Sequence, residues 1–154
     1  MSSEERVTVA GFVLALDRCY QSDTHMWVSP NQPGRVRIGM DALGVETSGT
    51  LSELSFAEVG TELIAGRPFG QLEAVKFVGP LMSPVSGRVA ATNDEVAMDP
   101  GLAERDPYGA GWLIEAELKE TGTELLGLLA DRDEITAWFV AKIADYRLKG
   151  VIAE

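Results

Sequence analysis

Turn-forming residues divide the chain into short apolar runs, and this spacing constrains the fold more than any other feature. Glycine and proline recur about every eight to twelve residues along most of the sequence. The runs between them that resemble strands are RVTVAGFVLALD, THMWVSP, GRVRIGM, TELIAGRPFGQLEAVKF, SGRVAATN and GWLIEAEL. Short strands separated by turns are typical of a small sheet sandwich or barrel. A chain of 154 residues is the size of one domain and can bury a core without disulfides or a structural metal.

The C-terminal segment LLADRDEITAWFVAKIADYRLKG has a different, helical periodicity. Its large apolar residues fall on one helical face: Ile135, Trp138, Phe139, Ile143 and Tyr146. Asp131, with Glu134 three residues later, predicts a capping box, and Gly150 predicts the end of the helix. We therefore expect a mainly β fold with one C-terminal α-helix, at 130–149, packed on the sheets by its apolar face.

Charge and hydropathy exclude several classes of function. The formal net charge is −11, and phosphate binding needs clustered Lys and Arg, so we expect no nucleic-acid partner. No apolar run approaches the roughly 18 residues that a membrane span requires. The N-terminus, MSSEERVTVAGF, lacks a basic region before its apolar segment. We expect a cytoplasmic protein with no membrane partner.

The negative charge is concentrated in one region. Between Val89 and Glu134 there are twelve Asp or Glu against three Lys or Arg. One interpretation is a solvated acidic face that maintains solubility. The other is a surface that steers basic partner enzymes toward the protein.

Residues capable of catalysis are scarce. His25 is the only histidine, and its neighbours in THMWVS indicate the start of a strand, so we expect a structural or surface role. Cys19 is the only cysteine; it excludes an intramolecular disulfide and is more typical of a small apolar core residue than of a nucleophile. No Cys/His grouping has zinc spacing. The sequence favours a protein that is not an enzyme and takes any redox chemistry from an added cofactor.

Lys76 is the one charged residue in the middle of an apolar run. The run QLEAVKFVGPLMSPVSG places it between Val75 and Phe77, before a turn predicted at Gly79-Pro80. With strands at Gly70–Lys76 and Leu81–Val85, the lysine lies near the tip of the hairpin that joins them. An exposed tip lysine is ordinary in a surface turn, so the residues alone favour no special role.

The segment from Glu73 to Leu113 resembles, without gaps, the H protein of the glycine cleavage system. The markers at family spacing are Glu73, Val75 and Lys76 of its E-S-V-K motif, Ser83–Gly87, Asn93, Pro100, Asp106–Gly109 and Gly111–Trp112. Upstream, HMWV at His25–Val28 resembles the family's H-E-W-V, and GRVRIGM resembles its strand ending at a glycine, here Gly39. The resemblance extends over roughly His25 to Leu129.

This resemblance implies a barrel-sandwich hybrid, the lipoyl-domain fold, in which two small sheets present the lysine on a tight hairpin. It implies that Lys76 carries lipoate through an amide bond, placed there by a lipoate ligase or transferase. The arm would carry an aminomethyl group between a decarboxylase, a transferase and a dihydrolipoamide dehydrogenase. The chain would then be one non-catalytic carrier domain, 1–154, and a monomer, with an extension or edge strand at 1–24, a lipoyl-domain core at 25–129 and the helix after it.

Some residues depart from the family pattern. Ala74 replaces the usual Ser, Phe77 replaces a small residue, and Gly79-Pro80 replaces a polar pair. The family segments T-D-Y-A-Q and D-I-V-x-V-x-L-P are here Asp41–Val45 and Thr50–Ala57. These departures leave two alternatives open: a lipoate-binding protein of sulfur oxidation that works with a heterodisulfide-reductase-like complex, or an interaction protein whose lysine stays unmodified. A biotin carrier is less favoured, because biotin carriers usually have methionine on both sides of the lysine.

Three apolar residues near the lysine have two possible roles. Phe77, Leu81 and Met82 could line a groove in which the arm rests, or they could belong to the sheet core. For each residue taken singly, we favour the core.

Overall fold

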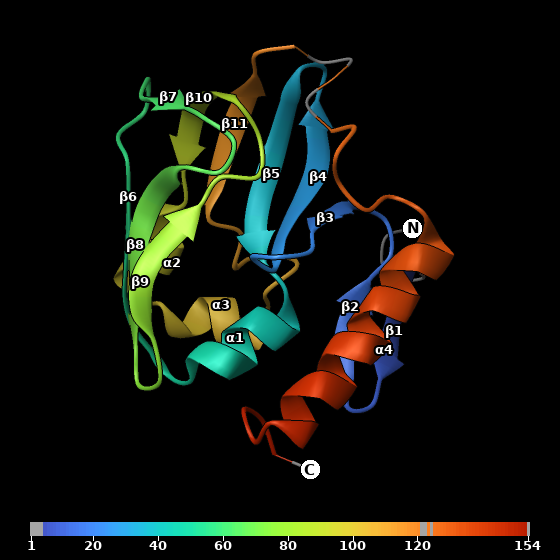
Figure 1. Ribbon diagram of the computed structural model, residues 1–154. Helices are drawn as coiled ribbons and strands as arrows, with labels where there is room; N and C mark the ends of the chain where they lie inside the picture. The colour runs from blue at the N-terminus through green and yellow to red at the C-terminus, as the bar shows by residue number, and fades with distance from the viewer. Residues whose placement is uncertain (1–4, 121–122, 124, 154) are drawn as a thin grey trace.

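The computed structural model describes residues 5–120, 123 and 125–153 (Figure 1). In chain order its elements are β1 (Arg6–Val9), β2 (Phe12–Ala15), β3 (Cys19–Gln21), β4 (Met26–Gln32), β5 (Arg35–Met40), α1 (Ala42–Ser48), β6 (Leu51–Phe56), β7 (Glu62–Leu63), β8 (Pro68–Ala74), β9 (Val78–Met82), β10 (Gly87–Thr92), α2 (Asp94–Met98), α3 (Gly101–Arg105), β11 (Ile114–Leu118) and α4 (Arg132–Leu148).

Two sheets face each other and enclose the main core. One has the order β3-β4-β5-β11-β10-β7 and the other the order β6-β8-β9, with antiparallel neighbours throughout (Figure 1). Buried side chains of both sheets meet between them, among them Ile38, Val89 and Ile114 from the larger sheet and Leu54, Leu72 and Leu81 from the smaller one. This arrangement confirms the predicted barrel-sandwich hybrid.

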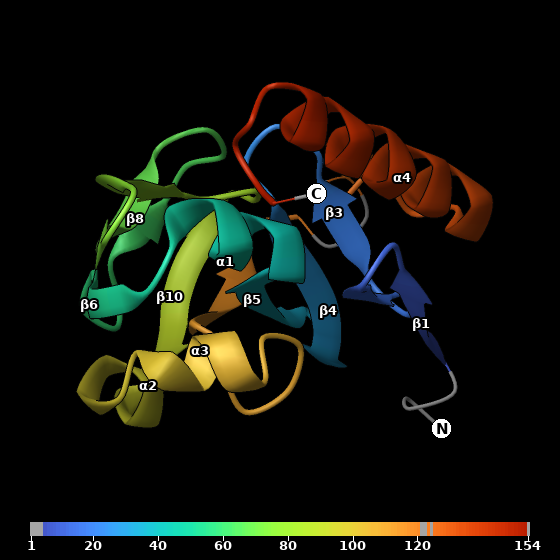
Figure 2. The same ribbon diagram turned by 90° about the horizontal axis from the view of Figure 1, so that it is seen from below.

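A second apolar cluster joins the two ends of the described chain. The β1–β2 hairpin forms a separate sheet, and α4 packs against this hairpin and β3 (Figure 2). Ile135, Phe139 and Ile143 of α4 are fully buried here, so the predicted apolar stripe is a packing surface. The division of the chain at 24 and 129 stays a prediction.

The predicted ends of α4 are confirmed. Asp131 caps the helix by accepting a hydrogen bond from the Glu134 amide at 3.0 Å. The helix stops just before Gly150, whose φ of 76° is in the left-handed region that favours glycine.

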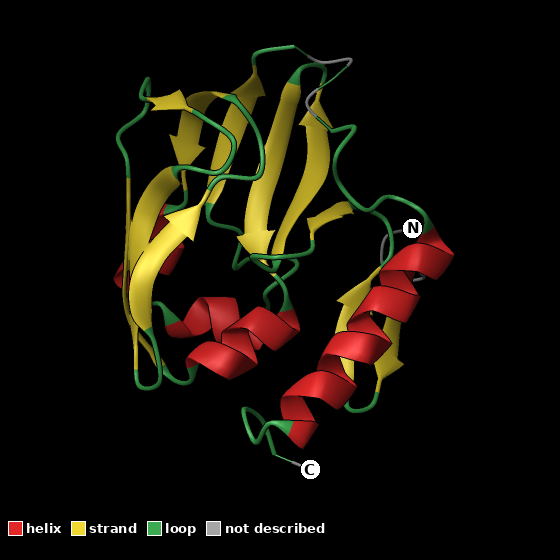
Figure 3. Cartoon of the chain, in the orientation of Figure 1, coloured by secondary structure: helices red, strands yellow, loops and turns green. Residues whose placement is uncertain are grey.

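Three short helices, α1 to α3, lie together at one end of the two sheets (Figure 3) and were not predicted. Each has only five to seven residues, too few for an apolar period to be visible in the sequence. Side-chain caps hold two of them: Asp41 accepts from Gly44 N in α1, and Asn93 accepts from Glu95 N in α2. Within the described ranges, none of the helices combines the length and apolar character needed to cross a membrane.

Gly39 illustrates how tightly the strands fit. It pairs with Trp27 across β4 and β5, and a Cβ at Gly39 would overlap the buried indole ring. We expect Gly39→Ala to lower the free energy of unfolding by about 1–3 kcal/mol, the usual cost of overpacking a core. The measurement is a urea unfolding curve.

Gly127→Ala is the matched control, because a Cβ at Gly127 meets no atom within 4 Å. Its effect should stay within about 0.5 kcal/mol. Equal stability of the two variants would show that the Trp27 ring and β5 can move apart without a loss of stability.

Candidate functional site

Lys76 lies in the tip that joins β8 to β9. Glu73 pairs with Val78, so the tip consists of Val75, Lys76 and Phe77. All three side chains are exposed, Val75 by 78% and Phe77 by 47%. Together with Val78, which is 65% exposed, Val75 and Phe77 place exposed apolar side chains around the lysine.

The predicted turn at Gly79-Pro80 was wrong. These residues lie inside β9, where Pro80 pairs with Gln71, and the strand begins at Val78 rather than at Leu81. Proline is accepted there because β9 is at the edge of its sheet, so the missing amide hydrogen faces no partner strand. The tip is consequently shorter than predicted and contains the lysine itself.

The tip is held against the end of α1. The Val75 amide donates to the Thr50 carbonyl at 3.0 Å, and the Lys76 amide donates to the Ser48 carbonyl at 2.9 Å. Between these two acceptors lies Gly49, with a φ of 85°. A Cβ at Gly49 would lie 3.3 Å from the Lys76 nitrogen and 3.2 Å from its Cε. The main chain and the side chain of Lys76 thus pass close to Gly49.

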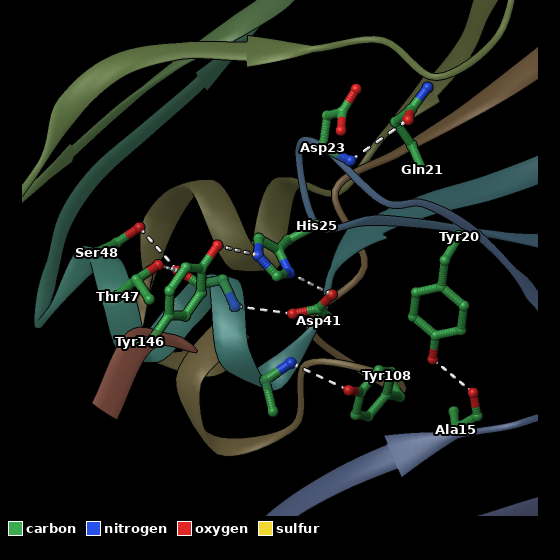
Figure 4. A network of polar contacts seen from close by, with 12 residues as sticks. Ala15, Tyr20, Gln21, Asp23, His25, Asp41, Thr47, Ser48, Tyr108 and Tyr146 are labelled. Atoms are coloured by element: carbon green, nitrogen blue, oxygen red, sulfur yellow. Dashed lines mark hydrogen bonds and ion pairs between the residues drawn. The ribbon is translucent and has the colours of Figure 1, made fainter. Parts of the chain in front are cut away.

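A buried polar network fixes α1 in place (Figure 4). Asp41 is fully buried; one carboxylate oxygen accepts from Gly44 N at 2.8 Å, and the other lies 2.9 Å from His25 Nδ1. His25 Nε2 is 2.9 Å from the hydroxyl of Tyr146 in α4. Both imidazole nitrogens are therefore engaged, and the histidine has a structural role, one of the two roles expected from the sequence.

Tyr108 joins the N-terminal hairpin to the same helix. Its hydroxyl donates to the Val13 carbonyl at 2.7 Å and accepts from the Ala42 amide at 3.0 Å. Burial raises the pKa of Tyr108 well above its usual value, so the hydroxyl remains protonated and keeps its donor role. These two hydrogen bonds position the β1–β2 hairpin against α1. The role of Tyr108 was not predicted from the sequence.

Two grooves meet at the lysine. The first, which we call the apolar groove, has a volume of about 390 Å³. It is lined by Asp23, Thr24, His25, Met26, Met40, Gly44, Thr47, Ser48, Leu72, Lys76, Phe77, Pro80, Leu81 and Met82. Phe77, Leu81 and Met82 all line it, while Leu81 is also part of the main core. The favoured core role is therefore confirmed for Leu81 alone: it was wrong for Phe77, which is 47% exposed, and Met82 is only partly buried and lies outside the main core.

The second groove, which we call the charged groove, has a volume of about 640 Å³. It is lined by Gly11, Phe12, Val13, Ala42, Val45, Glu46, Gly49, Thr50, Val75, Lys76, Glu104, Arg105 and Pro107. Helix α1 separates the two grooves, and among the described residues Lys76 alone lines both. A group attached to this lysine could enter either groove.

Cys19 lies away from both grooves. It is half-buried and packs against the main core, and burial raises the pKa of its thiol. A thiol that stays protonated is a poor nucleophile, which agrees with its expected role as a packing residue.

Comparisons with known proteins agree on one family. The family model described as "Glycine cleavage H-protein" matches residues 18–140. A glycine cleavage system H protein of Mycobacterium leprae is 39% identical over 98 residues, which cover 64% of this chain and 74% of the relative. One of Corynebacterium jeikeium is 38% identical over 104 residues, which cover 66% of this chain and 82% of the relative.

A solved structure agrees with the sequence matches. The crystal structure of a glycine cleavage system H protein from Mycobacterium marinum aligns with a TM-score of 0.70 and 33% identity, covering 80% of this chain and 97% of the other. The resemblance seen in the sequence is confirmed, and the chain belongs to the glycine cleavage H-protein family.

Proposed function

We propose that this chain is a lipoyl carrier of the H-protein type and that Lys76 is the residue to which lipoate is attached. The observation that carries the proposal is the position of the lysine, exposed on a hairpin tip whose main chain is held by two hydrogen bonds. A modifying enzyme can reach such a side chain without unfolding the sheet, and the attached arm has a fixed origin. Family membership supports the carrier function over the sulfur-oxidation alternative and over an unmodified interaction protein.

The surroundings of Lys76 fit a lipoyl group. Amidation removes the ammonium charge, so the extended side chain becomes mostly apolar. The apolar groove offers Met26, Met40 and Met82 beside Phe77, all within a space that the lysine itself lines. Methionine side chains are flexible and polarisable and adapt to such a ligand. When bound, lipoate supplies two sulfur atoms for group transfer and redox chemistry.

The chain serves its partner enzymes as a carrier, and the catalysis belongs to those enzymes. His25 is the only imidazole lining either groove in the described ranges, and both of its nitrogens are engaged. The proposed partners are those implied by the family: a decarboxylase, an aminomethyl transferase, a dihydrolipoamide dehydrogenase, and a lipoate ligase or transferase. A monomer would keep the tip accessible to each of them. Monomeric state and cytoplasmic location stay predictions.

Intact mass tests the attachment site. Protein produced with lipoate and a lipoate ligase should gain the mass of one lipoyl group, and Lys76→Arg should abolish the gain. Arginine keeps the positive charge, but the same ligase cannot form the amide on its side chain. Lys119→Arg is the control and should still be modified. A mass gain that persists in Lys76→Arg would contradict the proposal. So would the absence of a mass gain under conditions that modify another H protein.

The support of the tip by Gly49 can be tested separately. Gly49→Ala and Gly66→Ala both place a side chain at a residue whose φ is 85°, a value that L-residues rarely adopt. Only at Gly49 would the new Cβ press on Lys76; at Gly66 it meets no atom within 4 Å. We expect the rate of lipoylation to be lower for Gly49→Ala than for Gly66→Ala. Equal rates would mean that modification does not depend on how the tip is held.

The acidic region from Val89 to Glu134 leads to a prediction about partner association. If it steers basic partner enzymes, the association rate should fall as salt rises, because exposed charges are screened beyond about 10 Å at 0.1 M ionic strength. Stopped-flow mixing with a partner enzyme measures this rate. An association rate independent of salt would leave the region with a role in solubility alone.

A further inference from the structure

Three arginines meet in a pocket that shares no residue with either groove. Arg6 comes from β1, Arg18 from the segment between β2 and β3, and Arg37 from β5. The pocket has a volume of about 300 Å³. Asp17 is the only carboxylate among the described residues that line it, so three cations and one anion give the lining a net charge of +2. A local excess of positive charge attracts anions even on a chain whose net charge is −11.

Arg18 is held so that one of its nitrogens stays available. Its side chain is only 5% exposed. Nε donates to the Asp17 carboxylate at 2.9 Å, and Nη1 donates to the Tyr108 carbonyl at 2.9 Å. The guanidinium carbon lies 4.6 Å from the centroid of the Trp27 ring. Among the described residues Nη2 has no hydrogen-bond partner, so this fixed guanidinium can donate to a ligand in the pocket.

Arg37 and Arg6 bring further free donors to the pocket. Arg37 Nε donates to Glu115 at 3.0 Å, and its guanidinium carbon lies 4.5 Å from the centroid of the Trp112 ring. In the part of the chain that the structure describes, its two terminal nitrogens have no partner. Arg6 is 3.8 Å from Asp106, too far for a hydrogen bond, and its buried Nε has no partner among these same residues. A buried donor without an acceptor costs free energy, which a bound oxyanion would recover.

Phosphate fits this set of donors better than carboxylate does. A guanidinium binds either group through two parallel N–H donors. A carboxylate has two oxygens in one plane, whereas a phosphate has at least three that point in different directions and can accept from several arginines at once. Ser29 and Asn31 also line the pocket and add a hydroxyl and an amide. The volume is at the lower end of the range for ligand sites, which favours a small ligand.

We propose that this pocket binds a phosphate group, either as inorganic phosphate or as a small phosphate monoester. Arg18 holds the phosphate at the buried side, and Arg6 and Arg37 bind it from β1 and β5. The bound ligand thereby fastens the N-terminal hairpin to the larger sheet. Arg6 lies before residue 18, where the family match begins. Binding here needs no arm on Lys76 and is separate from the proposed carrier function.

Titration of the whole chain with inorganic phosphate, at an ionic strength held constant with sodium chloride, tests the site. We expect saturable shifts of the amide resonances of Ser29, Asn31 and Gly109, which line the pocket. Glycerol 1-phosphate is the monoester, and the tighter of the two phosphates shows whether the natural ligand carries an organic group. Acetate should bind more weakly than both. No saturable shift with either phosphate, or tighter binding of acetate, would overturn the inference.

Arg37→Gln and Arg88→Gln are a matched pair of variants. Both arginines are at least partly exposed, and each pairs with a glutamate of β11, Glu115 or Glu117, but only Arg37 lines the pocket. We expect Arg37→Gln to weaken phosphate binding about tenfold or more, because it removes a charge-assisted contact, and Arg88→Gln to leave the affinity unchanged. Equal losses in the two variants would mean that phosphate responds only to overall charge, which would contradict the pocket.

The melting temperature tests the role of the hairpin. A ligand that binds only the folded chain raises this temperature. Phosphate also stabilises proteins in general, because it is excluded from their surfaces, so the comparison between variants is the measure. The rise caused by phosphate should be smaller in Arg6→Gln than in Arg88→Gln. Equal rises would show that β1 takes no part in binding and would overturn the proposed link between the hairpin and β5.

Discussion

The site depends on two backbone hydrogen bonds between the hairpin tip and the end of α1. They bring the amides of Val75 and Lys76 to carbonyls of Thr50 and Ser48, on the two sides of Gly49. A hairpin tip without such support would fray, because its residues lie beyond the last pairs of the sheet. Here the tip is part of the rigid fold, although its side chains are exposed. An attached arm would move about a fixed point.

The position of the hairpin tip depends in turn on how α1 is held in the fold. The helix has only seven residues and would be unstable alone. It is stabilised by the buried Asp41 carboxylate, which caps it and lies against His25, and by the Tyr108 hydroxyl at its first residue. His25 is in turn in contact with Tyr146 of α4. The C-terminal helix, distant from Lys76 in sequence, thus contributes to positioning the tip.

Much of the fold could be predicted from local pattern. The turn spacing indicated short strands, and the apolar stripe with Asp131 and Gly150 indicated α4, because its seventeen residues make the helical period visible. The turn at Gly79-Pro80 was placed wrongly, since a Gly-Pro pair resembles a turn unless one knows that the strand is at a sheet edge. Helix α1 was missed because Gly44 lies in its middle and its stability comes from tertiary contacts.

The sequence by itself determined the family, the exposed position of Lys76 near a hairpin tip, and the scarcity of catalytic groups. These follow from markers at fixed spacing and from residue types that local chemistry restricts. Only the tertiary structure decided that the lysine lies between two grooves of different polarity, because Met26, Glu46 and Phe12 come from separate segments. Their meeting at one lysine is set by the packing of the sheets, α1 and the N-terminal hairpin, and residue spacing along the chain carries no record of it.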